Sequence, residues 1–364
     1  MNRLKQITIR GFKSLRQVNQ LKLDDVNILI GPNGSGKSNF IDFFKMLNWM
    51  TSGKGNLQTF VNKSGGAHSL LFDGPKTSKS IEAHLLFASD QGENEYHIKL
   101  KQGPQDSLVF EEEKYRYSSA RFEGKAEWTN LGFNHRELQL LGRTDPTARY
   151  VLGALRKFVV YQFHNTSDTA RMRNRWNMED DSFLKRDGAN IAPFLYRLKR
   201  QRKGHYERIR DCIRRCLPFF DDFFLDPDGD SIGLRWREKE SGYILGPHQA
   251  SDGMLRTVCL ATLFLQPEEW LPSVMIIDEP EMGLHPFAIN TVIDLIKEVS
   301  INTQIIIATQ SPSFVDRFDA DQLITAQRKD RETEFDRLDM NHLQHWMHTY
   351  NSVNAWLDYY EIDD

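Results

Sequence analysis

Residues 26–38 read Val-Asn-Ile-Leu-Ile-Gly-Pro-Asn-Gly-Ser-Gly-Lys-Ser, and this stretch decides the fold. Its first five residues are mostly apolar and predict a short buried strand. Residues 31–38 fit the pattern G-x-x-x-x-G-K-[ST], and the segment that follows, through Met50, has the spacing of an amphipathic helix. A strand, a glycine-rich loop and a helix in this order form the context in which the pattern binds nucleotide phosphates.

The residue types in this loop suit a nucleotide with Mg²⁺. Glycines let backbone N–H groups converge on phosphate oxygens, Lys37 adds positive charge at the β- and γ-phosphates, and the Ser38 hydroxyl is a ligand for Mg²⁺. An ordinary glycine-rich turn would leave the Lys37-Ser38 pair unexplained. We therefore predict ATP and Mg²⁺ as cofactors. The predicted cofactor-binding residues of the loop are Asn33, Gly34, Ser35, Gly36, Lys37, Ser38 and Asn39.

A second, acidic motif follows another apolar run. Residues 274–277 predict a buried strand, and Asp278-Glu279-Pro280-Glu281 comes directly after it. Open α/β sheets place their ligands at the carboxyl ends of their strands. We predict that Asp278 holds Mg²⁺, directly or through water, and that Glu279 is the catalytic base that polarises the attacking water. Taken alone, an Asp-Glu pair at a strand end is usually solvated acid.

Composition sets broad limits on the class of protein. The 364 residues are 40% hydrophobic and 27% charged, with a formal net charge of −3. No run approaches the ~18 apolar residues needed to cross a bilayer, and the N-terminus lacks an export signal, so we expect no membrane partner. There are three cysteines, of which Cys212 and Cys216 lie four residues apart on a predicted helix without zinc-like partners. These features favour a reduced, cytoplasmic setting.

The pattern of apolar residues changes along the chain. Residues 3–10 predict a strand, and residues 78–130 contain the short alternating runs of an antiparallel sheet. Helical spacing with frequent Arg and Lys dominates residues 145–220, and buried-strand runs return at 274–277 and 305–308. No repeat or sustained heptad pattern predicts a coiled-coil arm.

Together the motifs resemble an ABC-type ATPase head of the SMC/RecF-like and OLD-like AAA-family ATPases, over nearly the whole chain. These relatives are bacterial and associated with defence or repair. The resemblance rests also on four shorter stretches, in matching order and spacing: Ile9-Arg10-Gly11-Phe12-Lys13-Ser14, Ser251-Asp252-Gly253, Gly283-Leu284-His285-Pro286 and Thr309-Gln310-Ser311-Pro312.

The resemblance implies an α/β fold, that of a P-loop NTPase of ABC-ATPase type, with a mixed core sheet, an antiparallel β subdomain and a helical insertion. Four segments are expected. They are an N-terminal part of the ATPase core (1–75), the antiparallel β subdomain (76–144), a helical or lid insertion with a basic surface (145–249), and a C-terminal part of the core with the signature-like, acidic and switch motifs (250–364).

The resemblance also implies that subunits act in pairs. Ser251-Asp252-Gly253, at a predicted helix start, corresponds to the signature motif that contacts the γ-phosphate bound by a second subunit, which implies a head-to-tail dimer. A simple helix N-cap is the other interpretation of these residues. The loop Gly283-Leu284-His285-Pro286 resembles one that couples the two nucleotide sites, although a strand-to-helix connection favours Gly and Pro for geometric reasons alone.

Three further site residues follow from the resemblance. Gln310 stands at the catalytic switch position where histidine is usual. Its amide can hydrogen-bond a γ-phosphate but cannot become a cation, so we expect slow hydrolysis. Gln162 and His164 follow a predicted strand at 158–161, where such heads place a glutamine or histidine that contacts Mg²⁺ or water. For His164, a structural, hydrogen-bonded histidine is the alternative.

A cluster of basic residues at 171–215 is the only feature of the sequence that supports binding of double-stranded DNA. The same cluster is also explained by a solvated helical face. Its members are Arg171, Arg173, Arg175, Arg197, Lys199, Arg200, Arg202, Lys203, Arg208, Arg210, Arg214 and Arg215.

Two functional hypotheses remain open. In the first, an ATPase dimerises on ATP and switches DNA engagement or a partner effector, in antiphage defence or DNA repair. In the second, ATP stabilises an oligomeric scaffold that regulates a separately encoded nuclease or toxin with little turnover. The chain itself is not predicted to be a nuclease, because after Asp316 only two edge strands and two short helices with Trp346 and Trp356 are expected.

Overall fold

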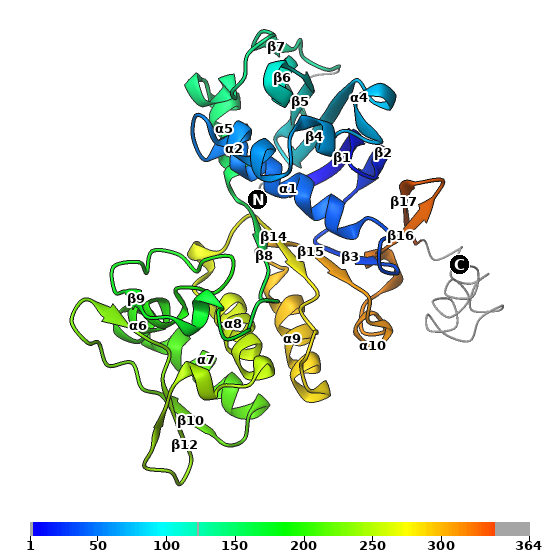
Figure 1. The fold of residues 1–364 in the computed structure, drawn as a ribbon. Coiled ribbons are helices and arrows are strands. Elements are labelled where there is room, and N and C mark those ends of the chain that lie inside the picture. The colour runs from blue at the N-terminus through cyan, green and yellow to red at the C-terminus, as the bar shows by residue number, and fades with distance from the viewer. Residues whose placement is uncertain (1–2, 122–123, 339–364) are drawn as a thin grey trace, which may run out of the picture. The chain divides into compact units, whose positions relative to one another are not determined.

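The computed structural model of the chain describes residues 3–121 and 124–338 (Figure 1). They divide into two compact units. The first unit holds the described residues of 1–160, 272–276 and 304–364, and the second holds residues 161–271 and 277–303. None of the helices in the described part of the chain combines the length and the apolar character that a membrane span requires.

One sheet of the first unit is antiparallel throughout, with strand order β2-β1-β4-β5-β6-β7. Its strands are β1 (Arg3–Phe12), β2 (Leu15–Lys22), β4 (Ser80–Ser89), β5 (Gly92–Gln102), β6 (Leu108–Ser119) and β7 (Thr129–Asn130). Along β4 the side chains of Ile81, Ala83 and Leu85 are fully buried, whereas Glu82 and His84 point to the opposite face. The antiparallel sheet predicted for residues 78–130 is therefore confirmed.

The other sheet has the order β17-β16-β3-β15-β14-β8. Its strands are β3 (Val26–Ile30), β8 (Phe158–Tyr161), β14 (Val274–Asp278), β15 (Gln304–Thr309), β16 (Leu323–Lys329) and β17 (Glu332–Arg337). β3 pairs in parallel with β15 on one side and with β16 on the other. All five residues of β3 are buried, as expected of a strand covered on both faces.

β16 and β17 are the two predicted strands at the sheet edge, and the predicted helices that carry Trp346 and Trp356 lie outside the described residues. The last residues of β8 and β14 belong to the second unit.

An aromatic cluster on α1 fills the core of the first unit. Phe40, Phe43 and Phe44 recur at helical spacing and are fully buried. The ring of Phe43 lies 5.4 Å from that of Phe12, and the ring of Phe44 lies 5.4 Å from that of Phe158. The helices of this unit are α1 (Lys37–Thr51), α2 (Asn56–Lys63), α3 (Ala67–Leu70), α4 (Gly74–Thr77), α5 (Pro146–Arg156) and α10 (Pro312–Val315).

The second unit contains the helices α6 (Ile191–Gln201), α7 (Lys203–Cys216), α8 (Asp252–Leu265) and α9 (Pro286–Val299). Its short strands are β9 (Trp176–Asn177), β10 (Phe220–Phe223), β11 (Ser231–Ile232), β12 (Trp236–Glu238) and β13 (Ile244–Leu245).

The prediction of helical structure from 145 to 220 is wrong for residues 162–190, which contain one short 3-10 turn and β9. Side chains hold this backbone instead. Asn190, fully buried, donates hydrogen bonds to the carbonyls of Asp180 and Phe183.

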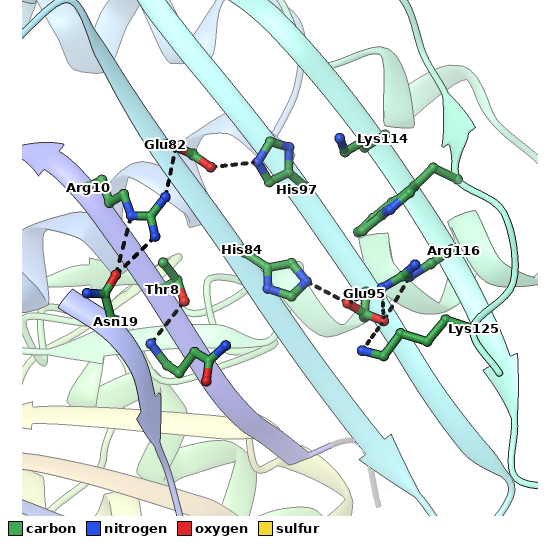
Figure 2. Close-up of a pocket in the computed structure, with 12 residues that line it drawn as sticks. Thr8, Arg10, Asn19, Glu82, His84, Glu95, His97, Lys114, Arg116 and Lys125 are labelled. Carbon is green, nitrogen blue, oxygen red and sulfur yellow. Dashed lines mark hydrogen bonds and ion pairs between the residues drawn. The ribbon is translucent and has the colours of Figure 1, made fainter. Parts of the chain in front are cut away.

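The outer face of the antiparallel sheet carries a charged network beside a pocket of about 420 Å³ (Figure 2). Glu95 lies there with 1% of its side chain exposed, and it accepts hydrogen bonds from Arg116 (2.8 Å), His84 (2.7 Å) and Lys125 (3.1 Å). Burial alone raises the pKa of Glu95, but these hydrogen bonds outweigh burial and hold its pKa well below the usual range of a glutamate. Trp128 covers the network, with the Arg116 guanidinium 4.3 Å from its ring centre.

Candidate nucleotide-binding site

The phosphate-binding loop joins β3 to α1 in the first unit. Gly36 is the residue before α1, and its φ of +102° lies in the left-handed region that favours glycine. A Cβ at Gly36 would also lie 1.9 Å from Thr333 Oγ1, whereas a Cβ at Gly34 would meet no atom within 4 Å. In the described structure no side chain caps α1, so its first N–H groups face the loop. This is the arrangement in which a helix N-terminus holds a phosphate.

Lys37 lies across the same loop. Its side chain is buried, and Nζ donates hydrogen bonds to the carbonyls of Gly31 (2.5 Å) and Pro32 (2.8 Å). Asn33 and Ser38 are exposed at the loop, and Ser35 is buried beneath it. The Lys37 ammonium group is thus held by carbonyls of the loop, while Ser38 is exposed.

The opening motif at residues 9–14 packs behind this loop. Ser14 Oγ is 2.7 Å from Thr333 Oγ1 and accepts a hydrogen bond from Asn39 Nδ2, also at 2.7 Å. The Lys13 ammonium pairs with Asp42 at 2.6 Å. Asn39, predicted to contact the cofactor, therefore has its amide turned to Ser14. Thr333 was not predicted, because nothing in the local sequence of β17 signals contact with a loop 300 residues earlier.

Gln310 follows the strand beside the loop. Ile30 and Thr309 are register partners in the parallel pair of β3 and β15, so Gly31 and Gln310 both leave the carboxyl ends of adjacent strands. Gln310 is half-buried, and the following turn is fixed by Ser311 N–H, which donates to Thr309 Oγ1 at 2.9 Å. The structure thus brings the predicted switch residue to the same sheet edge as the loop.

The acidic strand end lies in the second unit, with two predicted residues around it. Gln162 Nε2 donates a hydrogen bond to Asp278 Oδ2 at 2.9 Å, and His164 Nε2 lies 3.4 Å from the same oxygen. Asp278 has 15% of its side chain exposed. Glu279 has a φ of +43°, a left-handed conformation that is uncommon for glutamate and found at functional sites. A cavity of about 10 Å³ is lined by His164, Asp278 and Glu279, about the space that one water needs.

The predicted signature residues begin α8. Ser251 is the N-cap, and its Oγ accepts a hydrogen bond from Met254 N–H at 3.2 Å. A Cβ on Gly253 would lie 2.7 Å from the carbonyl oxygen of Gly283, so the start of α8 packs closely on the loop after the acidic strand. Asp252 pairs with Arg173 at 3.2 Å. Ser251 therefore caps α8, as the N-cap interpretation predicts. A role of these residues toward a second subunit stays a prediction.

Two arginines that the sequence did not single out as site residues organise these loops. Arg256 on α8 donates to the carbonyls of Met282 (2.7 Å), His164 (3.0 Å) and Phe163 (3.3 Å). Arg173 is buried and donates to the carbonyls of Thr166, Pro247 and Ala250. Arg256 thus joins α8, the segment after β8 and the segment after β14 within one unit.

Much of the basic population at 171–215 is paired locally. Arg202 pairs with Glu269 at 2.8 Å, Arg208 with Glu298 at 2.6 Å and Arg214 with Asp221 at 2.7 Å. Arg171 pairs with Asp187, and Arg175 pairs with Asp228. These pairs favour the solvated, ion-paired interpretation of the region over a surface of uncompensated cations.

The residues fit a nucleotide with a divalent cation. Across residues 3–121 and 124–338 there is no group of three or more His, Cys, Asp or Glu side chains arranged to hold a metal. Nucleotide-bound Mg²⁺ does not need such a group, since it takes one or two protein ligands and completes its shell with phosphate and water oxygens. The glycine cradle at Gly34 and Gly36, the Lys37 ammonium and the Ser38 hydroxyl supply what a triphosphate requires.

The fold and this loop define a P-loop NTPase of ABC-ATPase type. A family model described as "AAA domain, putative AbiEii toxin, Type IV TA system" matches residues 26–316, and the chain belongs to this family. No curated protein matches the sequence.

Solved structures of SMC heads share the fold. The SMC head bound to the C-winged helix domain of ScpA has 16% identity and a TM-score of 0.61, with 93% of this chain and 99% of that chain covered. The Smc head from Pyrococcus furiosus, with an extended coiled coil and the C-terminal domain of ScpA, has 13% identity and a TM-score of 0.58, and the match covers 96% of this chain and 99% of that chain. The SMC head domain from Thermotoga maritima has 18% identity and a TM-score of 0.50, and the match covers 93% of this chain and 100% of that chain. The predicted resemblance and fold class are confirmed.

Proposed function

We propose that the chain binds ATP with Mg²⁺ and hydrolyses it slowly. The observation that carries the proposal is the loop at residues 31–38, where a left-handed Gly36, an uncapped helix start and a buried Lys37 meet in one turn. Membership of the AAA-domain family supports it. Bound Mg²⁺ would neutralise charge on the β- and γ-phosphates.

Each residue has a role that its position suits. In the first unit, Lys37 binds the β- and γ-phosphates and Ser38 is a ligand for the cation. In the second unit, Asp278 is proposed as a cation ligand and Glu279 as the base for the proton of the attacking water. Gln162 and His164 orient the Asp278 carboxylate, because both contact its Oδ2. Gln310 hydrogen-bonds the γ-phosphate without a titratable proton, which is why we propose slow turnover.

Two heads are proposed to pair head to tail, each offering Ser251, Asp252 and Gly253 to the nucleotide of the other. The start of α8 supports this role, since its N-terminal dipole suits an anion. Met282 and Phe287 flank the neighbouring loop and are 37% and 50% exposed, so apolar surface is available there for a second subunit. Two of the three solved SMC heads named above are bound to a domain of ScpA, which supports a protein partner for this chain also.

The physiological role proposed is control of a partner effector or of DNA in antiphage defence or DNA repair. The family description names a toxin–antitoxin system, which supports the effector version. Because the basic region at 171–215 is largely ion-paired, we rank control of DNA below control of a partner effector. Charge reversal at Arg200, Arg202 and Lys203 tests whether this region binds DNA. If salt-dependent DNA binding persists in that variant, these residues are not the DNA-binding surface.

An ATP-stabilised scaffold that regulates a separately encoded nuclease or toxin is the second candidate. Gln310 at the switch position favours it, because a head that holds ATP without rapid turnover would serve as a stable platform.

One experiment separates the two candidates. ATP turnover and mass in solution are measured for the wild type and for Glu279→Gln, with and without double-stranded DNA. For the ATPase we expect Glu279→Gln to lower turnover by ~10²–10⁴-fold and to accumulate an ATP-bound dimer. If neither protein hydrolyses ATP while both assemble on it, the scaffold replaces the ATPase.

A further inference from the structure

The hairpin of β16 and β17, drawn in orange in Figure 1, contacts both ends of the phosphate-binding loop. A Cβ at Gly31, the first residue of the loop, would overlap the carbonyl oxygen of Ala326 in β16. A Cβ at Gly36 would overlap Thr333 Oγ1 in β17. In the middle of the loop, no described atom lies within 4 Å of a Cβ at Gly34. The hairpin therefore backs the two ends of the loop and leaves its middle open.

Thr333 joins this hairpin to the start of α1. It is 1% exposed, its N–H donates to the Ser14 carbonyl oxygen at 2.8 Å, and its Oγ1 lies 2.7 Å from Ser14 Oγ. Ser14 Oγ also accepts a hydrogen bond from Asn39 Nδ2 at 2.7 Å. Asn39 belongs to the first turn of α1, directly after Lys37 and Ser38. A chain of polar side chains thus links β17 to the turn that carries the phosphate-binding groups.

β17 is held in place by contacts of its own. Phe335 lies two residues after Thr333, on the same face of the strand, and its ring is 5.1 Å from the ring of Phe40 in α1. Arg337, the last residue of β17, pairs with Asp24 at 3.1 Å. Thr333 therefore projects from a strand whose position does not depend on the Thr333 hydroxyl alone.

We propose that Thr333 is a positioning residue for nucleotide binding. Through Ser14 and Gly36 it holds the loop in the conformation that accepts the β- and γ-phosphates before the nucleotide arrives. Because Thr333 is buried behind the loop, it acts through the loop and not on the nucleotide itself. The inference rests on the ATP binding proposed above. A loop that is already ordered loses little conformational freedom on binding, so this role contributes to affinity.

Equilibrium binding of ATP and of inorganic triphosphate to the full-length protein tests this role, with both ligands displacing a fluorescent ATP analogue. Thr333→Val removes the hydroxyl and keeps the branched shape of the side chain. Since the net contribution of one hydrogen bond corresponds to ~2–10-fold in an equilibrium constant, we expect the dissociation constants of both ligands to rise by that factor. An equal rise places the loss at the phosphates. Unchanged dissociation constants, or a rise for ATP alone, would overturn the proposal.

Two further substitutions separate positioning from general damage. Thr333→Ser keeps the hydroxyl and should bind both ligands within ~2-fold of the wild type. If it binds as weakly as Thr333→Val, the hydroxyl is not what positions the loop. Thr262→Val is the matched control, because Thr262 is fully buried in α8 and its Oγ1 donates to the Val258 carbonyl at 2.7 Å. It should bind as the wild type does, and equal weakening there contradicts a specific role for Thr333.

Ser14→Ala removes the same hydrogen bond from the other side. It should weaken binding of both ligands, and the double variant with Thr333→Val should be no weaker than the weaker single variant, because the two changes remove one shared contact. Circular dichroism checks folding. Should Thr333→Val not fold, Ser14→Ala decides, and wild-type affinity in it refutes the positioning role.

The two proposals can fail separately. If the wild type binds neither ATP nor triphosphate, nucleotide binding fails and the role of Thr333 fails with it. If the wild type binds both ligands and Thr333→Val binds them equally well, only the role of Thr333 fails.

Discussion

Gln162 donates its amide hydrogen to Asp278, with Nε2 2.9 Å from Oδ2. The first residue after β8 thereby fixes the carboxylate at the end of β14. The amide is a neutral donor that carries no titratable proton. The contact defines the orientation of the acidic group that we propose to hold the cation.

Replacing Gln162 with alanine tests that orientation. Because partners behind a metal ligand typically contribute ~10–100-fold to metal affinity or activity, we expect Gln162→Ala to raise the Mg²⁺ concentration needed for half-maximal turnover within that range. Thermal stability should stay close to that of the wild type. Gln201→Ala, at an exposed position on α6, is the control. An unchanged Mg²⁺ dependence would mean that Asp278 needs no positioning.

Gln310, at the switch position, leads to a separate prediction. Gln310→His supplies a group that can become a cation as charge develops on the phosphate, so steady-state turnover should rise by ~10-fold or more. Nucleotide affinity, measured by equilibrium binding, should change little because the amide and the imidazole both donate a hydrogen bond. An equal or lower rate would show that a step other than this contact limits turnover.

A methyl group on Gly253 should disturb the contact between α8 and the loop at Gly283. Its Cβ would lie 2.7 Å from the Gly283 carbonyl oxygen, so Gly253→Ala must separate the two segments, at a cost of ~1–3 kcal/mol in the free energy of unfolding. Turnover should fall as well. Gly153→Ala is the matched control, because its Cβ meets no atom within 4 Å in α5, and it should stabilise the fold by ~0.5–1 kcal/mol. Wild-type stability in Gly253→Ala would contradict the close packing.

The charged network in Figure 2 predicts acid sensitivity. The pKa of Glu95 in the folded state lies below the unfolded value of ~4.3, so the ionised carboxylate stabilises the fold above that pH. This contribution is lost as the pH falls through the folded-state pKa. Glu95→Gln should therefore be clearly less stable than the wild type near neutral pH, and the difference should shrink below pH ~4 in denaturant unfolding.

The neighbouring Glu93→Gln is the control for that measurement. Its side chain is 42% exposed, and its effect should stay within ~0.5 kcal/mol at every pH. A difference between wild type and Glu95→Gln that does not depend on pH would refute the network as the source of acid sensitivity.

Local sequence patterns were sufficient to predict the strand, loop and helix at 26–50 and the acidic end of β14. These features depend on the spacing of apolar residues and on residue type within a few positions of the chain. They were insufficient for Arg173, which the sequence places among surface cations. It is buried because its guanidinium donates to the carbonyl of Pro247, 74 residues away. The irregular backbone of 162–190 was missed for the same reason, because distant and side-chain hydrogen bonds replace the helical ladder.

β3 carries the phosphate-binding loop near the start of the chain, yet both of its sheet neighbours, β15 and β16, come from the last quarter of the described chain, as does Thr333 behind Gly36. During translation these early residues leave the ribosome long before the strands that flank them exist. Strand pairing over such a sequence separation is slow, and the apolar side chains of β3 stay exposed to solvent until it occurs. A nascent chain halted before residue 304 would contain the residues of the loop without the strands that hold it, so ATP binding would report that synthesis had passed β15 and β16.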